Sequence, residues 1–280
     1  MDGASPLRPE GKVKQVAAAI DPVIVRLGPF AIRWYGLLMA VSVAVGFYYL
    51  RRDASKLGYS EDFIYNLALV AVLGGIAGAR AVYVATNWEV YAGSLAAILR
   101  IDQGGLSFHG AIIGGGLAAG LYTARKGYSF DELADLIVPG IAVGIMLVRI
   151  ANYINGEVLG RPAEILDFAR QPAQFIGSAV GLVLLIVHNV LARRRPPAGY
   201  LFWSFVTYYS LLRGVVEESV RENPLYAWGY ISERYGLGFF TLTQLLTPLF
   251  VLIGWAMVRR SLRLDRRPMG PRVRAGESRP

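Results

Sequence analysis

The stretch Leu133–Ala151 reads LADLIVPGIAVGIMLVRIA and is the clearest guide to the architecture of this chain. Before Arg149, its only charged residue is Asp135. An α-helix of about 20 apolar residues is needed to cross a hydrocarbon core about 30 Å thick. The stretch therefore predicts a helix that spans a membrane.

Six further apolar stretches of comparable length occur, three before this one and three after it. Such a chain is expected to fold as an all-α, polytopic integral membrane protein, because each backbone amide in lipid must be bonded internally. Interfacial or periplasmic segments would join about seven transmembrane helices. The expected spans cover roughly 30–50, 62–86, 107–124, 133–151, 172–192, 199–216 and 239–258.

The composition supports a membrane location and narrows the chemistry. Hydrophobic residues make up 54% of the chain and charged residues 18%, whereas soluble domains carry about 25% charge. The net charge of +9 comes from Lys and Arg at the ends of apolar stretches and in the tail from Arg259 to Arg279. This placement indicates contacts with anionic membrane lipids and not with nucleic acid. The chain has no cysteine, which excludes disulfides, thiolate metal sites and a cysteine nucleophile of its own.

Positive charge predicts the orientation in the membrane, because connections rich in Lys and Arg stay cytoplasmic. The basic connections hold Arg51, Arg52 and Lys56; Arg125 and Lys126; Arg193, Arg194 and Arg195; and the Arg-rich tail. We therefore expect an extracytoplasmic N-terminal segment over 1–29, a seven-helix transmembrane domain over 30–258, and a basic, disordered cytoplasmic tail over 259–280. The basic residues that oppose this orientation are Arg8, Lys12, Lys14 and Arg26.

Three ionisable residues near the expected extracytoplasmic ends of spans are candidates for a site: His109, Arg149 and Arg213. Charged groups in transmembrane segments are costly and commonly functional. Each also has a structural interpretation, since His109 could be a packing residue and a terminal arginine often extends to the headgroup level. Asn152 and Glu157, close to Arg149, favour a binding site instead. Two guanidiniums on one side of a bilayer suit a phosphodiester, because each offers a planar fork of donors.

His109 lies in the stretch Gly104-Gly-Leu-Ser-Phe-His109-Gly. Glycines around a histidine allow a bulky ligand to approach, although glycines also let helices pack closely. The chain contains no P-loop, no Ser-His-Asp set, and no HExxH or other metal-ligand motif. We therefore expect neither a metal nor an organic cofactor.

Several motifs resemble those of the prolipoprotein diacylglyceryl transferase family. The most specific runs from Arg149 to Arg161 as Arg-Ile-Ala-Asn-Tyr-Ile-Asn-Gly-Glu-Val-Leu-Gly-Arg. The others are Ile32-Arg-Trp-Tyr-Gly36, Gly78-Ala-Arg80, the glycine-rich stretch around His109, and Arg213 with Glu217. The resemblance covers the chain from about residue 21 to residue 258.

The resemblance implies seven spans, an extracytoplasmic N-terminus and a cytoplasmic C-terminus in the bacterial inner membrane. It also implies an enzyme that moves the diacylglyceryl group of phosphatidylglycerol to the lipobox cysteine of a prolipoprotein signal peptide, forming a thioether and releasing glycerol phosphate. Its site would lie in the 30–258 domain, near the outer face of the membrane. The implied catalytic residues are Tyr35, His109, Arg149 and Arg213. The implied lipid-binding residues are Arg149, Asn152, Glu157, Gly160, Tyr209, Arg213 and Glu217.

One motif departs from the family pattern and keeps alternatives open. Where the family reads Arg-His-Pro-Ser-Gln-Leu-Tyr-Glu, this chain reads Arg-Gln-Pro-Ala-Gln-Phe-Ile-Gly from Arg170 to Gly177. A divergent paralogue with another lipid or acceptor substrate is one alternative. A lipid or solute transporter is another, although no span looks interrupted at its middle and no inverted repeat is evident. A CDP-alcohol phosphotransferase would need an acidic Mg²⁺ motif that the sequence lacks.

The expected reaction gives the polar residues distinct roles. His109 is the natural base for a substrate thiol, because an imidazole can take up a proton near neutral pH. Arg149 and Arg213 would meet the charge that builds on the departing phosphate. In the alternative mechanism, an arginine field lowers the thiol pKa and His109 only positions the substrate.

Overall fold

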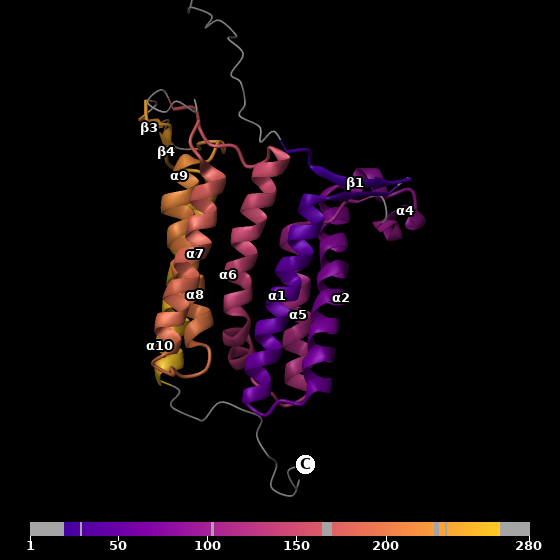
Figure 1. Cartoon of the computed structure of the whole chain (residues 1–280), viewed down its shortest axis with the longest axis vertical. Coiled ribbons are helices and arrows are strands. Elements are labelled where there is room, and N and C mark those ends of the chain that lie inside the picture. The colour runs from indigo at the N-terminus through magenta and orange to yellow at the C-terminus, as the bar shows by residue number, and fades with distance from the viewer. Residues whose placement is uncertain are drawn as a thin grey trace, which may run out of the picture. The chain divides into compact units, whose positions relative to one another are not determined.

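The computed structural model describes residues 20–28, 30–101, 104–163, 170–226, 230–232 and 234–263. These residues are mostly helical (Figure 1). Two short antiparallel hairpins accompany the helices: β1 (Val23–Leu27) pairs with β2 (Phe30–Arg33), and β3 (Tyr230–Ser232) pairs with β4 (Leu237–Gly238). The first expected span therefore begins too early, because residues 30–33 form a strand and the helix begins at Trp34.

The expected spans coincide with the long helices. These are α1 (Trp34–Lys56), α2 (Glu61–Thr86), α5 (Phe108–Arg125), α6 (Phe130–Asn155), α7 (Ala173–Ala192), α8 (Tyr200–Leu211) and α10 (Leu242–Arg263). Within the described ranges, α2, α6, α7 and α10 are long and apolar enough to cross a membrane. Helix α5 has 18 residues and many glycines, and α8 has 12 residues before its geometry changes. The fold is that of a multi-pass membrane protein, and the number of seven spans stays a prediction.

Two helices continue through an internal proline, Pro139 in α6 and Pro248 in α10. Helix α8 passes into a π-helical turn, η2 (Leu212–Glu217), and then into α9 (Glu218–Val220). Between α2 and α5 lie two short helices, α3 (Trp88–Tyr91) and α4 (Leu95–Leu99). The expected tail over 259–280 lies outside the described residues beyond Arg263, as does the N-terminal segment before Ile20.

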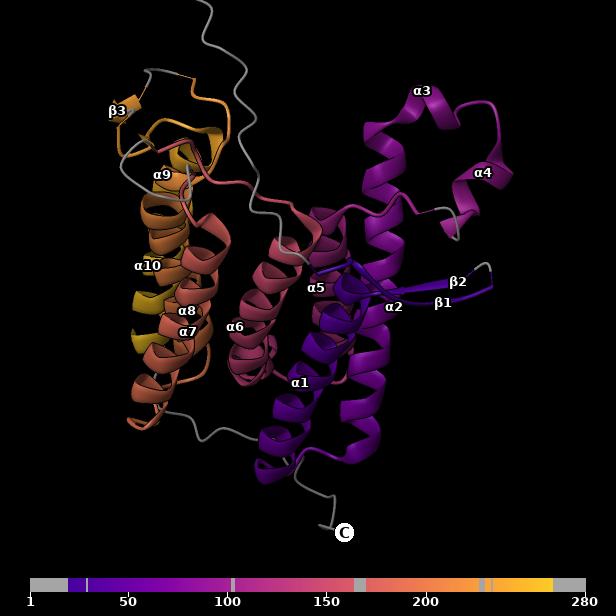
Figure 2. The ribbon, with the colours of Figure 1, turned by 45° about the horizontal axis from the view of Figure 1, so that its top comes forward.

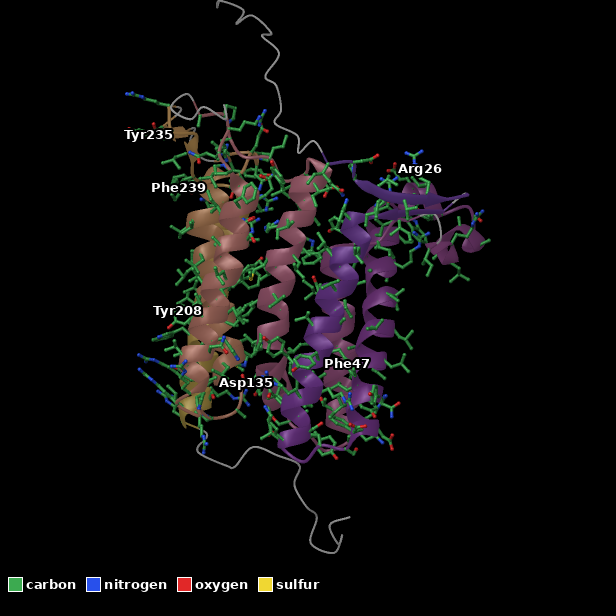
Figure 3. All side chains as sticks on the ribbon, viewed as in Figure 1. Arg26, Phe47, Asp135, Tyr208, Tyr235 and Phe239 are labelled. Carbon is green, nitrogen blue, oxygen red and sulfur yellow. The ribbon has the colours of Figure 1, made fainter. Side chains whose placement is uncertain are left out.

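The chain divides into two compact units. The first unit comprises Met1–Val45, Ile141–Arg194 and Trp203–Arg259; the second comprises Gly46–Gly140, Arg195–Phe202 and Arg260–Pro280. Nitrogen and oxygen atoms gather toward the ends of the helices, while carbon predominates between them (Figure 3). This distribution is what a hydrocarbon environment around the middle of each helix requires.

In the second unit, α2 and α5 cross at glycines. A Cβ on Gly78 would lie 2.4 Å from the carbonyl oxygen of Gly110 and 2.7 Å from the Cα of Gly114. Only glycine permits this approach, which is common where helices pack in membranes. The crossing brings the Ser107 amide within 3.0 Å of the Ala79 carbonyl oxygen, just before α5 begins.

The same unit contains an aromatic core. Tyr59, Phe63, Tyr122 and Tyr128 contact one another, with ring centroids 4.4–5.6 Å apart. The Tyr59 hydroxyl donates to Glu132 at 3.0 Å, so the buried carboxylate has a partner. This core joins the start of α2 to the start of α6.

The start of α8 is capped by a buried carboxylate. Asp135 of α6, labelled in Figure 3, accepts hydrogen bonds from the Gly199 and Phe202 amides, each at 2.7 Å. The Phe202 amide belongs to the first turn of α8 and the Gly199 amide comes just before it, where amides have no partner within the helix. The one acidic residue in the 133–151 stretch is thus a helix cap.

Candidate functional site

The candidate site is built around a π-helical turn in the first unit. In an α-helix, residues five apart point about 140° away from each other around the axis. The wider π-turn, whose bonds run from residue i to i+5, brings such residues onto one side. Arg213 accordingly contacts both Glu217 and Glu218, four and five residues later. The turn therefore lets one guanidinium face two carboxylates.

Glu217 is the centre of the cluster. Its side chain is fully buried. Arg149 Nη2 of α6 lies 2.6 Å from Glu217 Oε1, Arg213 Nε lies 3.6 Å from Oε2, and Arg221 Nη1 lies 3.9 Å from Oε1. A buried charge is retained only when it is paired. Glu217 thus holds in one place Arg149 of α6 and two arginines of its own segment, four residues before and after it.

Glu218 forms the second carboxylate of the cluster. It pairs with Arg213, accepts a hydrogen bond of 2.6 Å from Asn223 Nδ2, and lies 3.9 Å from Arg221 Nη1. Burial is the largest single influence and opposes its ionisation, but Arg213, Asn223 and Arg221 together outweigh burial, so the pKa of Glu218 lies below its usual value. The carboxylate is therefore charged at neutral pH.

The three guanidiniums and two carboxylates leave one net positive charge. Burial lowers the pKa of the Arg221 guanidinium, and repulsion from Arg213 and Arg149 lowers it further. Arg149 Nε is also buried without a hydrogen-bond partner. A buried cluster with more guanidiniums than carboxylates is suited to an anion.

Asn152 connects Arg149 to Glu157 at the end of α6. With its amide oxygen turned toward Arg149, Asn152 accepts from Nη1 at 3.2 Å and donates to Glu157 Oε2 at 3.3 Å. Asn155 Nδ2 donates to Glu157 Oε1 at 3.3 Å, while its own Oδ1 is buried without a hydrogen-bond partner. The polar residues of the 149–157 motif therefore form one connected group.

A pocket of about 580 Å³ opens beside this group, still within the first unit. Tyr35 at the start of α1, Asn155 and Glu157 provide its polar wall, together with Arg33. Backbone and apolar side chains from β2 and α1 form the remainder: Ala31, Ile32, Gly36 and Leu37. The pocket can hold a small polar group next to the arginine cluster.

Two glycines make the packing around the cluster possible. A Cβ on Gly177 would lie 2.6 Å from Arg149 Nε and 2.9 Å from the Glu217 carboxyl carbon. A Cβ on Gly160 would lie 1.8 Å from the Gln171 carbonyl oxygen. At Gly177, where the family pattern has glutamate, this chain has no room for a side chain while Arg149 and Glu217 are paired.

Backbone hydrogen bonds tie the end of the 149–161 motif to the segment after η2. The Arg161 amide donates to the Val220 carbonyl oxygen at 2.7 Å, and the Glu222 amide donates to the Leu159 carbonyl oxygen at 2.9 Å. Figure 1 shows the loop after α6 and helix α9 at the same end of this unit. These bonds fix Arg149 and Arg221 in one framework.

Every predicted site residue except His109 belongs to the first unit. Arg149, Arg213 and Glu217 are in direct contact, Asn152 and Glu157 extend the group, and Gly160 supports it. Tyr35 lines the pocket. Tyr209 lies one helical turn before Arg213, with its ring stacked on Phe205 at a centroid distance of 5.8 Å.

His109 lies in the second unit, in the first turn of α5, where its side chain is exposed. Its ring contacts the neighbouring Phe108 at a centroid distance of 5.9 Å. The Ser107 hydroxyl caps this turn by accepting from the Gly110 amide at 3.3 Å. His109 is thus accessible to a ligand, and its part in a site with the arginines stays a prediction.

Sequence reasoning missed two members of the cluster, Arg221 and Glu218. Arg221 lies in the connection between the sixth and seventh expected spans, where an arginine is equally consistent with a contact at the membrane surface. Its spacing of four residues from Glu217 could have indicated a pair on one helical face. Glu218, three residues before Arg221, could have been found in the same way, but its pairing with Arg213 could not, because that pairing depends on the π-turn.

Comparisons with known proteins place the chain in a family. A sequence model described as prolipoprotein diacylglyceryl transferase matches residues 22–260. A protein of Thermoanaerobacter sp. (strain X514) is 47% identical over 244 residues, which are 87% of this chain and 95% of that protein. Proteins of Thermus thermophilus and Geobacter sulfurreducens are 36% and 34% identical, over 85% and 90% of this chain and 97% and 98% of their own lengths. All three are named phosphatidylglycerol–prolipoprotein diacylglyceryl transferase.

These matches confirm the family that the sequence motifs predict. The matched region contains the whole arginine–glutamate cluster, the pocket beside it and His109. The chain belongs to the prolipoprotein diacylglyceryl transferase family.

Proposed function

We propose that this protein transfers the diacylglyceryl group of phosphatidylglycerol to a prolipoprotein, in the first step of bacterial lipoprotein maturation. The acceptor is the thiol of the lipobox cysteine in the signal peptide. The observation that carries the proposal is the buried cluster of Arg149, Arg213 and Arg221 around Glu217 and Glu218. Its guanidiniums offer the planar sets of donors that match the oxygens of a phosphodiester.

The reaction requires one carbon–sulfur bond to form as one carbon–oxygen bond breaks. The thiolate attacks the glycerol carbon that carries the phosphate, and glycerol phosphate leaves with the electron pair of the broken bond. Since the chain has no cysteine, the sulfur comes from the acceptor. Negative charge grows on the phosphate as it departs, and fixed donors that meet such charge are usually the largest catalytic contribution.

The arginines are proposed to bind the phosphate. Arg149 has an unpartnered Nε and is oriented by Glu217 and Asn152. Arg213 is held by Glu217 and Glu218. Orientation by buried carboxylates keeps the guanidinium planes fixed, so little reorganisation is needed when the phosphate leaves.

The pocket beside Tyr35 is proposed to receive polar atoms of the lipid headgroup. Glu157 and Asn155 offer oxygen acceptors there, which suit the hydroxyl groups of the terminal glycerol. Tyr209 and Gly160 are proposed to support the same site from the neighbouring segments.

His109 is proposed as the base that takes the thiol proton. A thiol with a pKa near 8.5 is only slightly ionised at neutral pH, so a base or a positive field assists it. His109 is exposed at the start of α5 and therefore accessible. The alternative is that the arginines lower the thiol pKa, and kinetics of a His109 variant distinguish the two.

The protein is proposed to lie in the bacterial inner membrane with the site toward the outer face, the N-terminus outside and the C-terminus in the cytoplasm. The support is the bias of Lys and Arg toward alternate connections.

The decisive experiment incubates the purified protein with phosphatidylglycerol and a lipobox peptide. Mass spectrometry should detect a peptide that carries diacylglycerol in thioether linkage, together with free glycerol phosphate. A peptide with serine in place of the lipobox cysteine is the matched control and should remain unmodified. Absence of product with phosphatidylglycerol, but product with phosphatidylethanolamine, would instead identify a paralogue with another lipid substrate.

A further inference from the structure

Arg80 is a buried cation that no part of the proposed mechanism uses. It lies on α2 in the second unit and is 7% exposed. Its guanidinium donates to four backbone carbonyl oxygens: Nε to Ile98 at 2.7 Å, Nη2 to Ala97 at 2.7 Å, and Nη1 to Gly104 and Gly105 at 2.9 Å each. One side chain thus binds the end of α4 and the segment that leads into α5.

The surroundings explain how a buried charge is stabilised here. The Ala97 and Ile98 carbonyls belong to the last turn of α4, where the carbonyl oxygens carry partial negative charge. The rings of Tyr91 and Tyr83 lie 4.9 Å and 5.9 Å from the guanidinium carbon. Carbonyl dipoles and aromatic faces therefore take the place of a carboxylate partner.

The backbone at Gly104 and Gly105 is shaped to fit this guanidinium. Both residues adopt positive φ angles, +83° and +76°. A Cβ on Gly105 would lie 2.7 Å from Arg80 Nη1 and 2.6 Å from the Tyr83 ring. The glycines thus allow both the turn and the close approach of Arg80.

This anchored segment is followed directly by the first turn of α5. The Ser107 amide donates to the Ala79 carbonyl at 3.0 Å, and Arg80 donates to the Gly105 carbonyl. Two neighbouring residues of α2 therefore bind the residues on either side of Leu106. His109 comes two residues after Ser107. Figure 2 shows α3 past the end of α2, and α4 to one side of α2. Arg80 binds the end of α4 to α2 through the Ile98 and Ala97 carbonyls.

We propose that Arg80 is a positioning residue for the transfer reaction: by binding four carbonyls it fixes the Gly104–Ser107 segment and thereby the location of His109. The catalytic part rests on the proposed function of His109. The structural part, that Arg80 orders this segment, can be tested without any activity. Lysine cannot replace Arg80, because one ammonium group cannot reach carbonyls spread around a planar fork.

The first test measures order in the segment and uses the absence of cysteine from the chain. A single spin label is attached at Leu106→Cys, an exposed position inside the segment, and a control label at Leu121→Cys, an exposed position farther along α5. In both Arg80→Gln and Arg80→Lys, the Leu106 label should become mobile while the Leu121 label keeps its spectrum. An unchanged Leu106 spectrum in a folded Arg80→Lys protein overturns the proposal.

The second test asks whether Arg80 acts through His109. Arg80→Gln should lower kcat about 10²-fold, the typical cost of misplacing a reacting group by about 1 Å. In a His109→Gln background, the same change should cost less than about 3-fold, because residues that act as a unit are not additive. A merely structural role predicts equal losses in both backgrounds, and that result overturns the proposal. If His109→Gln alone retains full activity, His109 is not the base. The spin label at Leu106→Cys still tests whether Arg80 orders the Gly104–Ser107 segment.

Discussion

Arg149→Lys is the most informative change, because it keeps the positive charge of the side chain and removes the planar guanidinium group. In the structure, Arg149 reaches Glu217 with Nη2 at 2.6 Å and Asn152 with Nη1 at 3.2 Å, while Nε has no partner. A lysine at this position can keep the ion pair with Glu217, but it loses the planar arrangement that directs the other donors.

The size of the effect follows from the lost bonds. A hydrogen bond to a charged group contributes about 1.5–3 kcal/mol. Loss of one such bond to the departing phosphate should therefore reduce kcat/KM by roughly 10- to 150-fold, at about 1.4 kcal/mol per tenfold. Loss of orientation by Asn152 adds to this, so we expect a reduction of about 10²-fold or more. The matching change Arg213→Lys should behave similarly, since Arg213 likewise has two partners, the carboxylates of Glu217 and Glu218.

The assay measures thioether product per milligram of inserted protein, with thermal unfolding in detergent as a check on folding. Arg51→Lys is the matched control, because Arg51 forms an exposed pair with Glu61 outside the cluster. If Arg149 merely extended to the headgroup level, lysine would serve as well. Normal activity of both Arg149→Lys and Arg213→Lys would therefore show that these arginines do not bind the phosphate through their planar guanidinium groups.

Three further predictions follow from the same structure. His109→Gln should insert normally and lower turnover by roughly 10²-fold, the usual effect of losing a general base; near wild-type turnover would make His109 a packing residue. Gly177→Ala should destabilise the fold by about 1–3 kcal/mol by overpacking and reduce transfer, because its Cβ would meet Arg149 Nε at 2.6 Å; the control Gly116→Ala has open space and should do neither. A reporter active only in the cytoplasm should be on when fused after Arg195 and off when fused near Gly160, and the reverse pattern would refute the orientation.

The long helices could be predicted from the sequence because each depends on a property of a continuous stretch. A run such as Leu133–Ala151 has no stable alternative in lipid to a helix, and the structure places it within α6. The boundary near residue 30 was wrong, because the pairing of β1 with β2 depends on contacts between two short segments and not on hydropathy. Hairpin residues such as Ile32 are as apolar as those of the helix that follows.

The site was predictable to the extent that its residues are close in sequence. Arg149 and Asn152 lie in the last turns of α6, and Glu157 comes two residues after its end, so their spacing alone suggests a polar group. Their partner Glu217 comes from a distant segment, and only the resemblance to a family connected the two. The pairing of Arg221 with Glu217 and Glu218 was not predicted, because an arginine between two spans is equally well explained as a determinant of topology.

The π-turn also constrains how the length of this chain can change. Each residue of an α-helix advances by about 100° around the axis. A π-turn holds one residue more than the α-helical turn it replaces, and it takes up that residue without rotating the helix that follows. Deleting one residue between Arg213 and Glu217 would therefore restore α-helical spacing, with the two carboxylates three and four residues after Arg213 and still on its side of the helix. Inserting one residue into an α-helical part of the segment would instead rotate the residues after it by about 100°. Between Arg213 and Arg221, the loss of a residue is therefore better tolerated than the gain of one.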